Sequence, residues 1–150
     1  MVKYRASIVV PYAQERVWKL MSDWTNLAKW DINITKSVLA ESEQPGACGE
    51  GTKYDCAFSL NGSEIPVNYN CIKYDEPRTC QFLGLAKLFR SQDTLEFEKE
   101  GEGTKLTAEF NLAFRGLLYP FSFLMNGAMQ KTGPIVMDDI QKFVDEELKK

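Results

Sequence analysis

Three side chains in this sequence have the chemistry to transfer protons inside an apolar environment: Asp93, Tyr54 and Tyr69. Asp93 alternates in step with Leu95 and Phe97, so a regular strand points its carboxyl group toward the core. Two outcomes are open: a bulge turns Asp93 to water, or it stays inside and pairs with a ligand hydroxyl or an arginine. Inside, its pKa would rise because burial disfavours the charged form, which suits acid–base catalysis. The tyrosines supply hydroxyl groups to an interior cavity or keep their tips in water.

The absence of histidine narrows the chemistry further. Without histidine, the chain cannot build Ser-His-Asp or Cys-His nucleophilic sites, nor an iron site of two histidines and a carboxylate. The four cysteines, at positions 48, 56, 71 and 80, show no C-x-x-C spacing, so we predict no metal site and no cofactor. We interpret Cys56 and Cys71 as small buried hydrophobic residues.

The composition is typical of an ordinary globular protein, with 44% apolar and 26% charged residues. We predict that residues 1–150 form a single domain. The net charge of −3 predicts no nucleic-acid partner, because such partners usually require a basic face. The first residues lack the apolar core of a signal peptide, so a cytoplasmic location is expected. The most apolar window, Leu117–Met129, is shorter than the ~20 residues that cross a bilayer, so no stable membrane insertion is expected.

Hydrophobic periodicity predicts one strand, two short helices, six further strands and a long C-terminal helix. Pro11 ends the first strand, the helix Ala13–Ser22 follows, and a second short helix begins at Thr25 or Asn26. The predicted strands span residues 3–10, 34–40, 52–60, 65–71, 79–85, 88–99 and 106–114.

The C-terminal helix is predicted from about Leu117 to Leu148, with Gly133-Pro134 inside it. We interpret this dipeptide as a kink, because the apolar register survives on both sides of it. Division into two helices is the alternative. The whole order predicts an α+β protein in which a curved antiparallel sheet grips the long helix around an apolar space.

Four short motifs carry a resemblance to a known superfamily. They are Ile8-Val-Val-Pro11, Glu15-Arg-Val-Trp18, Ser22-Asp-Trp-x-Asn-Leu-x-x-Trp30 and Gly49-Glu-Gly-Thr52. The chain resembles the START-like, or SRPBCC, superfamily of helix-grip proteins, and within it the polyketide cyclase/dehydrase and lipid-transport group. The resemblance implies a seven-stranded antiparallel sheet wrapped around the C-terminal helix, with an apolar cavity between them. The resemblance is compatible with many functions, because one fold can carry many different activities.

The inward-facing apolar side chains of the sheet and the helix are the candidate ligand-binding residues. Either they fill a core, or the curved sheet and the helix leave a pocket between them, apolar with few polar groups. The candidates are Trp30, Tyr54, Phe58, Tyr69, Phe82, Leu95, Phe97, Phe110, Leu112, Phe121, Leu124, Met125 and Ala128. Trp24 and Trp30 either pack the short helices onto the sheet or gate the mouth of the cavity.

The segment Leu117–Met125 is apolar nearly all round. Such a helix is ordinarily buried on most sides. Alternatively it forms a lid that makes transient contact with a membrane or a partner to exchange cargo. Exposure of the segment would support the lid hypothesis, and complete burial would exclude it.

Three functions follow from these observations. The leading hypothesis is binding of a hydrophobic small molecule, a lipid, isoprenoid or polyketide-like compound, as carrier or sensor. The alternative is a cyclase, dehydratase or aldolase that works without metal through tyrosine and aspartate. The second alternative, a co-chaperone-like protein-interaction module, predicts a filled core and an exposed apolar patch. The oligomeric state is left open.

Overall fold

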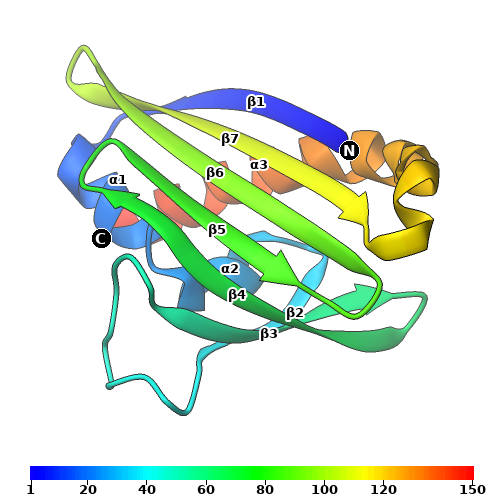
Figure 1. Ribbon diagram of the computed structural model, residues 1–150. Helices are drawn as coiled ribbons and strands as arrows, with labels where there is room; N and C mark the ends of the chain where they lie inside the picture. The colour runs from blue at the N-terminus through cyan, green and yellow to red at the C-terminus, as the bar shows by residue number, and fades with distance from the viewer.

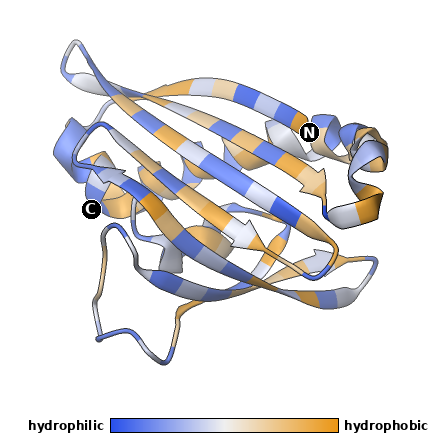
Figure 2. Ribbon diagram, viewed as in Figure 1, coloured by the Kyte–Doolittle hydropathy of each residue, from blue (hydrophilic) through white to orange (hydrophobic).

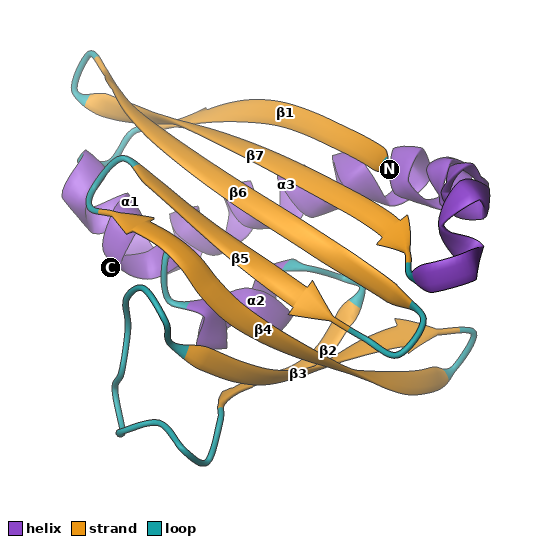
Figure 3. Cartoon of the chain, viewed as in Figure 1, coloured by secondary structure: helices purple, strands orange, loops and turns teal.

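Seven antiparallel strands form one curved sheet, in the order β1-β7-β6-β5-β4-β3-β2, in the computed structural model, which describes residues 1–150 (Figure 1). The strands are β1 (Val2–Val10), β2 (Ile34–Leu39), β3 (Lys53–Leu60), β4 (Ser63–Asp75), β5 (Thr79–Leu85), β6 (Phe89–Glu100) and β7 (Gly103–Phe114). The helical elements are α1 (Gln14–Met21), η1 (Trp24–Asn26), α2 (Leu27–Trp30), η2 (Gly116–Met125) and α3 (Asn126–Leu148). The helices α1, α2 and α3 lie against one face of the sheet (Figure 3). The α+β helix-grip fold predicted from the sequence is therefore confirmed.

The strands follow the alternation of polar and apolar residues that Figure 2 shows along each arrow. In β7, Leu106 and Ala108 are fully buried, whereas Glu109 is half-buried. β6 and β7 pair without interruption from Phe89–Phe114 to Glu100–Gly103. This unbroken register fixes which side chains of β6 face the helix, because side chains alternate between the two faces of a strand.

A short helical segment between β1 and β2 covers one end of the sheet. In α1, the side chains of Val17, Trp18 and Met21 are buried, as expected for one apolar helical face. The Asp23 side chain accepts a hydrogen bond of 3.0 Å from the backbone N–H of Thr25 and so caps η1. The second short helix expected from the sequence is thus a 3-10 turn, η1, that continues into the single turn of α2.

The C-terminal helix α3 continues through Pro134 without dividing, so the two-helix alternative is wrong. Gly133 lets this part of the helix approach β1 closely. A β-carbon at position 133 would lie 2.7 Å from carbon atoms of the Tyr4 ring, so no larger residue fits without movement. Neither α3 nor any other helix combines the length and the apolarity that crossing a membrane requires.

The segment before α3 differs from the sequence-based expectation of an α-helix beginning at Leu117. Residues 116–125 form the 3-10 helix η2 instead. The Ser122 hydroxyl accepts a hydrogen bond of 2.9 Å from the Phe114 N–H and donates one of 2.7 Å to the Tyr119 carbonyl. Such local side-chain bonds compete with the α-helical pattern of backbone bonds.

Three aromatic residues close the interior beside α1 and α2. The rings of Trp24 and Phe82 stack with centroids 3.9 Å apart and planes 8° from parallel. Trp30 packs its ring edge-to-face on Trp24, with centroids 5.5 Å apart. All three side chains are fully buried. We call Trp24, Trp30 and Phe82 the aromatic wall.

Candidate functional site

A cavity of about 240 Å³ lies between the sheet and the first turns of α3, and no residue of α1 or of the aromatic wall lines it. Thirteen of its nineteen lining residues are hydrophobic. They are Ile34, Phe58, Leu60, Val67, Tyr69, Phe89, Phe110, Leu112, Phe114, Met125, Ala128, Met129 and Val136. The other six are Asp31, Asn33, Ser91, Asp93, Thr132 and Gly133. An apolar enclosure with a few polar groups is typical of small-molecule sites.

Asp93 projects into this cavity from the middle of β6. It lies opposite Phe82 of β5 and Phe110 of β7 in an unbroken register, and its exposed fraction is 3%. The expectation that a bulge turns Asp93 to water is therefore wrong. No arginine pairs with it either. The Ser91 hydroxyl donates a hydrogen bond of 2.8 Å to its Oδ1, and the Tyr69 hydroxyl donates one of 3.2 Å to its Oδ2.

The surroundings of Asp93 favour its neutral form. Burial raises the pKa of Asp93 to about 7, and the charge of Asp31 raises it further, while the hydrogen bonds from Ser91 and Tyr69 act in the opposite direction. Burial, together with the charge of Asp93, raises the pKa of Tyr69 well above its usual value. The Asp93 carboxyl group is thus present in both protonation states near neutral pH, whereas Tyr69 stays neutral and donates its proton.

Asp31, which the sequence analysis missed, is a second acid on the lining. It follows Trp30 at the end of α2, and its Oδ1 accepts a hydrogen bond of 2.9 Å from the Asn33 N–H. Burial raises the pKa of Asp31 to about 6, against the lowering effect of the Asn33 hydrogen bonds. The one available signal in the sequence was its position directly after a tryptophan that anchors the short helix.

The cavity brings together only part of the candidate set. Phe58, Tyr69, Phe110, Leu112, Met125 and Ala128 line it, as does Asp93. Trp30, Tyr54, Phe82, Leu95 and Phe97 are fully buried in the core and do not line it. Phe121 and Leu124 lie outside on the surface. Trp24 and Trp30 therefore pack the short helices onto the sheet and do not stand at the cavity mouth.

Burial is the main cause that raises the pKa of the Tyr54 hydroxyl above its usual value. Burial likewise raises the pKa of Cys56 to about 12 and that of Cys71 to about 11, so both thiols stay protonated. These residues lie in the core beside the cavity. No group of three or more cysteine, aspartate or glutamate side chains comes together in a way that would hold a metal ion.

η2 leaves most of its apolar side chains in solvent. The exposed fractions are 96% for Leu117, 65% for Phe123 and 66% for Leu124. Its last residue, Met125, lines the cavity. The exposed apolar segment therefore adjoins the cavity wall directly, and the complete burial that would exclude the lid hypothesis does not occur.

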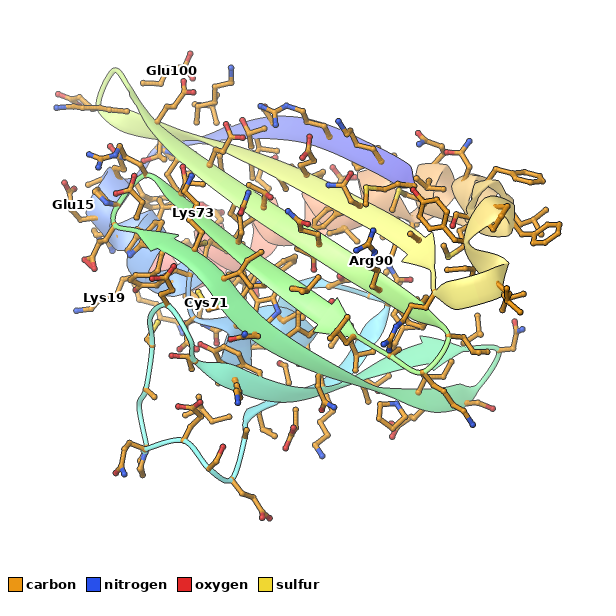
Figure 4. All side chains as sticks on the ribbon, viewed as in Figure 1. Glu15, Lys19, Cys71, Lys73, Arg90 and Glu100 are labelled. Atoms are coloured by element: carbon orange, nitrogen blue, oxygen red, sulfur yellow. The ribbon has the colours of Figure 1, made fainter.

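A second, larger depression of about 590 Å³ lies on the surface beside α1, under the loop between β2 and β3. Glu15 and Lys19, which Figure 4 shows at that end of the molecule, contribute to its lining together with Asp23 and Glu76. This depression has charged side chains in its lining and a minority of hydrophobic ones. The mostly apolar cavity with its buried acid is the better candidate site.

Comparison with solved structures gives the same fold. A START superfamily protein from Mycobacterium smegmatis matches with a TM-score of 0.75 over 96% of this chain and 97% of its own, at 10% identity. The Zhui aromatase/cyclase from Streptomyces sp. R1128 matches with a TM-score of 0.75 over 97% and 94%, at 12% identity. The di-domain aromatase/cyclase StfQ from the steffimycin biosynthetic pathway has a TM-score of 0.70 over 99% of this chain and 52% of its own, at 12% identity.

Sequence comparison identifies the family. None of the curated proteins compared with this sequence matches it. The model of the family described as polyketide cyclase/dehydrase and lipid transport matches residues 1–145. The motifs of the first thirty residues, the helix-grip fold and the cavity agree with this match. The chain therefore belongs to the polyketide cyclase/dehydrase and lipid transport family.

Proposed function

We propose that the protein binds a hydrophobic small molecule, such as a lipid, an isoprenoid or a polyketide-like compound, in the cavity between the sheet and α3. The enclosure of about 240 Å³ with mostly apolar walls is the observation that carries this function. Each Å² of apolar surface removed from water contributes roughly 25 cal/mol, less the cost of association. Such a protein acts as a carrier or a sensor.

Asp93 and Tyr69 give the cavity a polar end that orients the ligand. Their side chains are hydrogen-bonded to each other at 3.2 Å and are both buried. The side chains of Phe58, Phe110 and Leu112 give the cavity an apolar surface. A ligand with one polar end is therefore expected to bind in one preferred orientation.

Native mass spectrometry of freshly purified protein tests this function. A bound molecule of a few hundred daltons is the expected result, and Phe110→Asp should remove it because a carboxylate would then stand in the apolar wall. Val38→Asp, which introduces the same carboxylate at an exposed strand position, is the matched control. Retention of the bound molecule by folded Phe110→Asp would contradict the cavity assignment.

Acid–base catalysis on the bound molecule is a second candidate. Asp93, with a pKa of about 7 inside an apolar cavity, favours it. The Asp93 carboxylate would remove a proton from the carbon beside a ketone, and the resulting carboxylic acid would return that proton to a departing hydroxyl group, so that water is lost. The fold neighbours described as aromatase/cyclases are consistent with such chemistry.

Incubation of the purified protein with the extracted ligand distinguishes the two candidates. A decrease of the ligand mass by about 18 mass units, the mass of one water molecule, supports catalysis if Asp93→Asn abolishes it. An unchanged ligand mass supports a carrier or sensor. The interaction-module alternative expects a filled core and an exposed apolar patch. η2 supplies the exposed patch, but the cavity is at odds with a filled core, so this alternative is weaker.

We further propose that η2 makes transient contact with a membrane surface during ligand exchange. Residues 110–137 contain Arg115 and Lys131 but no aspartate or glutamate, although the whole chain has a net charge of −3. The Arg115 guanidinium donates a hydrogen bond of 2.6 Å to the Ala86 carbonyl in the β5–β6 connection. Lys87 belongs to the same connection, and Arg90 follows it at the start of β6 (Figure 4). Exposed apolar side chains beside cations suit an anionic lipid surface.

A further inference from the structure

The polar side chains that line the cavity present more hydrogen-bond acceptors than free hydrogen-bond donors to a ligand. The hydroxyl hydrogens of Ser91 and Tyr69 are both donated to Asp93. The Thr132 hydroxyl donates to the Ala128 carbonyl at 3.0 Å. The side-chain amide of Asn33 is the remaining donor on the lining, and it is directed at the Asp31 carboxyl group. The lone pairs of the three hydroxyl oxygens and the carboxyl groups of Asp31 and Asp93 remain for a ligand.

The two carboxyl groups have no cationic partner within the cavity. No lysine or arginine is among the lining residues. The titratable groups that face Asp93 are Tyr69 on β4, Cys56 on β3 and Asp31 after α2, and the charge of Asp139 in α3 raises the pKa of Asp31. All of these are acids. A buried carboxylate anion is normally paired with a cation or a metal, and an unpaired one is neutralised by protonation. Asp93 is buried and Asp31 half-buried with no protein cation on the lining, so a cationic ligand would supply the countercharge that their ionised forms lack.

We propose that the cavity selects an apolar molecule that carries a positively charged amino group, held by Asp93 and Asp31. This inference rests on the binding function proposed above and specifies its ligand class. An ammonium group donates three hydrogen bonds and accepts none, which matches the acceptors at the polar end. Phe58 and Phe110 would contact the apolar body.

The size of the cavity limits the apolar body. A volume of about 240 Å³ equals roughly eight water molecules at ~30 Å³ each. An amine with a chain of about eight carbons therefore fills it, and a longer chain would project past Ala128, which is exposed at the mouth. A fatty acid of the same length would add a third acid with no cation beside it, and is expected to be rejected.

Calorimetric titration at pH 7.5 with octylamine, 1-octanol and octanoate tests the inference with one apolar chain and three head groups. Octylamine should bind about tenfold or more tightly than 1-octanol, and octanoate should bind most weakly, because hydrogen bonds to charged groups are the stronger kind. The affinity for octylamine should increase from pH 6 to pH 8, as Asp93 loses its proton.

Two variants and one control locate the effect. Asp93→Asn and Asp31→Asn should each reduce the ratio of octylamine to octanol affinity by about fivefold or more. The exposed α3 variant Asp138→Asn should leave the ratio unchanged. Octanoate that binds as tightly as octylamine, or a ratio that survives both substitutions in folded protein, would overturn the amine preference while the cavity function stands. Failure of all three probes to bind would overturn both.

Discussion

The Tyr69 ring lies directly against the backbone of Gly84, and this contact aims the Tyr69 hydroxyl at Asp93. Gly84 of β5 pairs with Tyr69 of β4 in the sheet, and a β-carbon at position 84 would come within 2.6 Å of the ring. The absence of a side chain at position 84 therefore leaves the room in which the ring lies. The position of the Tyr69 hydroxyl, which donates a hydrogen bond to Asp93, therefore depends on Gly84, a residue that does not line the cavity.

Gly84→Ala should reduce the free energy of unfolding by about 1–3 kcal/mol, because the added methyl group forces the Tyr69 ring or the strand to move. Ligand binding should weaken as well. Urea unfolding measures the first effect and calorimetry the second. Gly127→Ala is the control: a β-carbon there meets no atom within 4 Å, and the helix gains up to about 1 kcal/mol. A harmless Gly84→Ala would show that the ring has another position available.

Stability should decrease as the pH rises from about 5 to 8. The folded-state pKa values of Asp93, about 7, and Asp31, about 6, lie above those of the unfolded chain, so the folded state binds more protons in this interval. The stabilisation is complete below the unfolded pKa and is lost as the pH passes through the folded values. For Asp93 the loss is on the order of 2–4 kcal/mol.

Asp93→Asn should remove most of this slope, since asparagine keeps the shape and an acceptor but does not titrate. Denaturant unfolding across pH 5–8 provides the measurement, with Asp138→Asn on the exposed face of α3 as the matched control. An undiminished slope in Asp93→Asn would place the titrating group elsewhere.

Ala128→Trp should block the cavity mouth. Ala128 lines the cavity yet is exposed, so a large side chain at this position obstructs entry with little change to the core. We expect an affinity loss of about tenfold or more with an unchanged unfolding midpoint. Gly127→Trp, one position earlier and outside the lining, is the control. Equal affinities for the two variants would argue for another entrance.

The double change Leu117→Asp/Phe123→Asp should abolish binding to vesicles that contain phosphatidylglycerol, measured by co-sedimentation. Both side chains are at least 65% exposed, and each large apolar side chain contributes roughly 1.5–3 kcal/mol when removed from water. Val9→Asp/Val38→Asp, two exposed strand positions, should retain binding. Binding of the unaltered protein to neutral phosphatidylcholine vesicles with equal strength would contradict the role of the cations.

Alternation along the chain was sufficient to predict the sheet, because the period of two is a local property of a strand. It placed Asp93 on the inward face only for a regular strand, and the absence of a bulge in β6 came from the structure. Alternation was not sufficient to predict the cavity. Leu95 and Phe97 share a face with Asp93, but they lie further along β6, in the core beside the aromatic wall. Alternation identifies a face, whereas the position of a cavity depends on contacts between distant elements.

The candidate list and the cavity lining differ in both directions. Lining residues inside strands and α3, among them Val67, Phe89 and Met129, were not among the candidates, and neither was Asp31. Asp31 belongs to the turn after α2, where no period exists to assign it a direction. Phe121 and Leu124 were placed on the cavity side by an α-helical period, and the 3-10 geometry of η2 turns them outward. The single-domain organisation, the cytoplasmic location and the ligand-binding residues stay predictions.

The aromatic wall separates the interior into two parts with different tolerance for change. Trp24 and Phe82 stack with ring centroids 3.9 Å apart and are fully buried, so substitutions there are expected to lower the free energy of unfolding. Beyond the wall, side chains such as Phe58, Phe110 and Met129 border empty space. Exchange of these side chains, in evolution or by design, can therefore change the ligand preference with little effect on the free energy of unfolding of the scaffold that holds them.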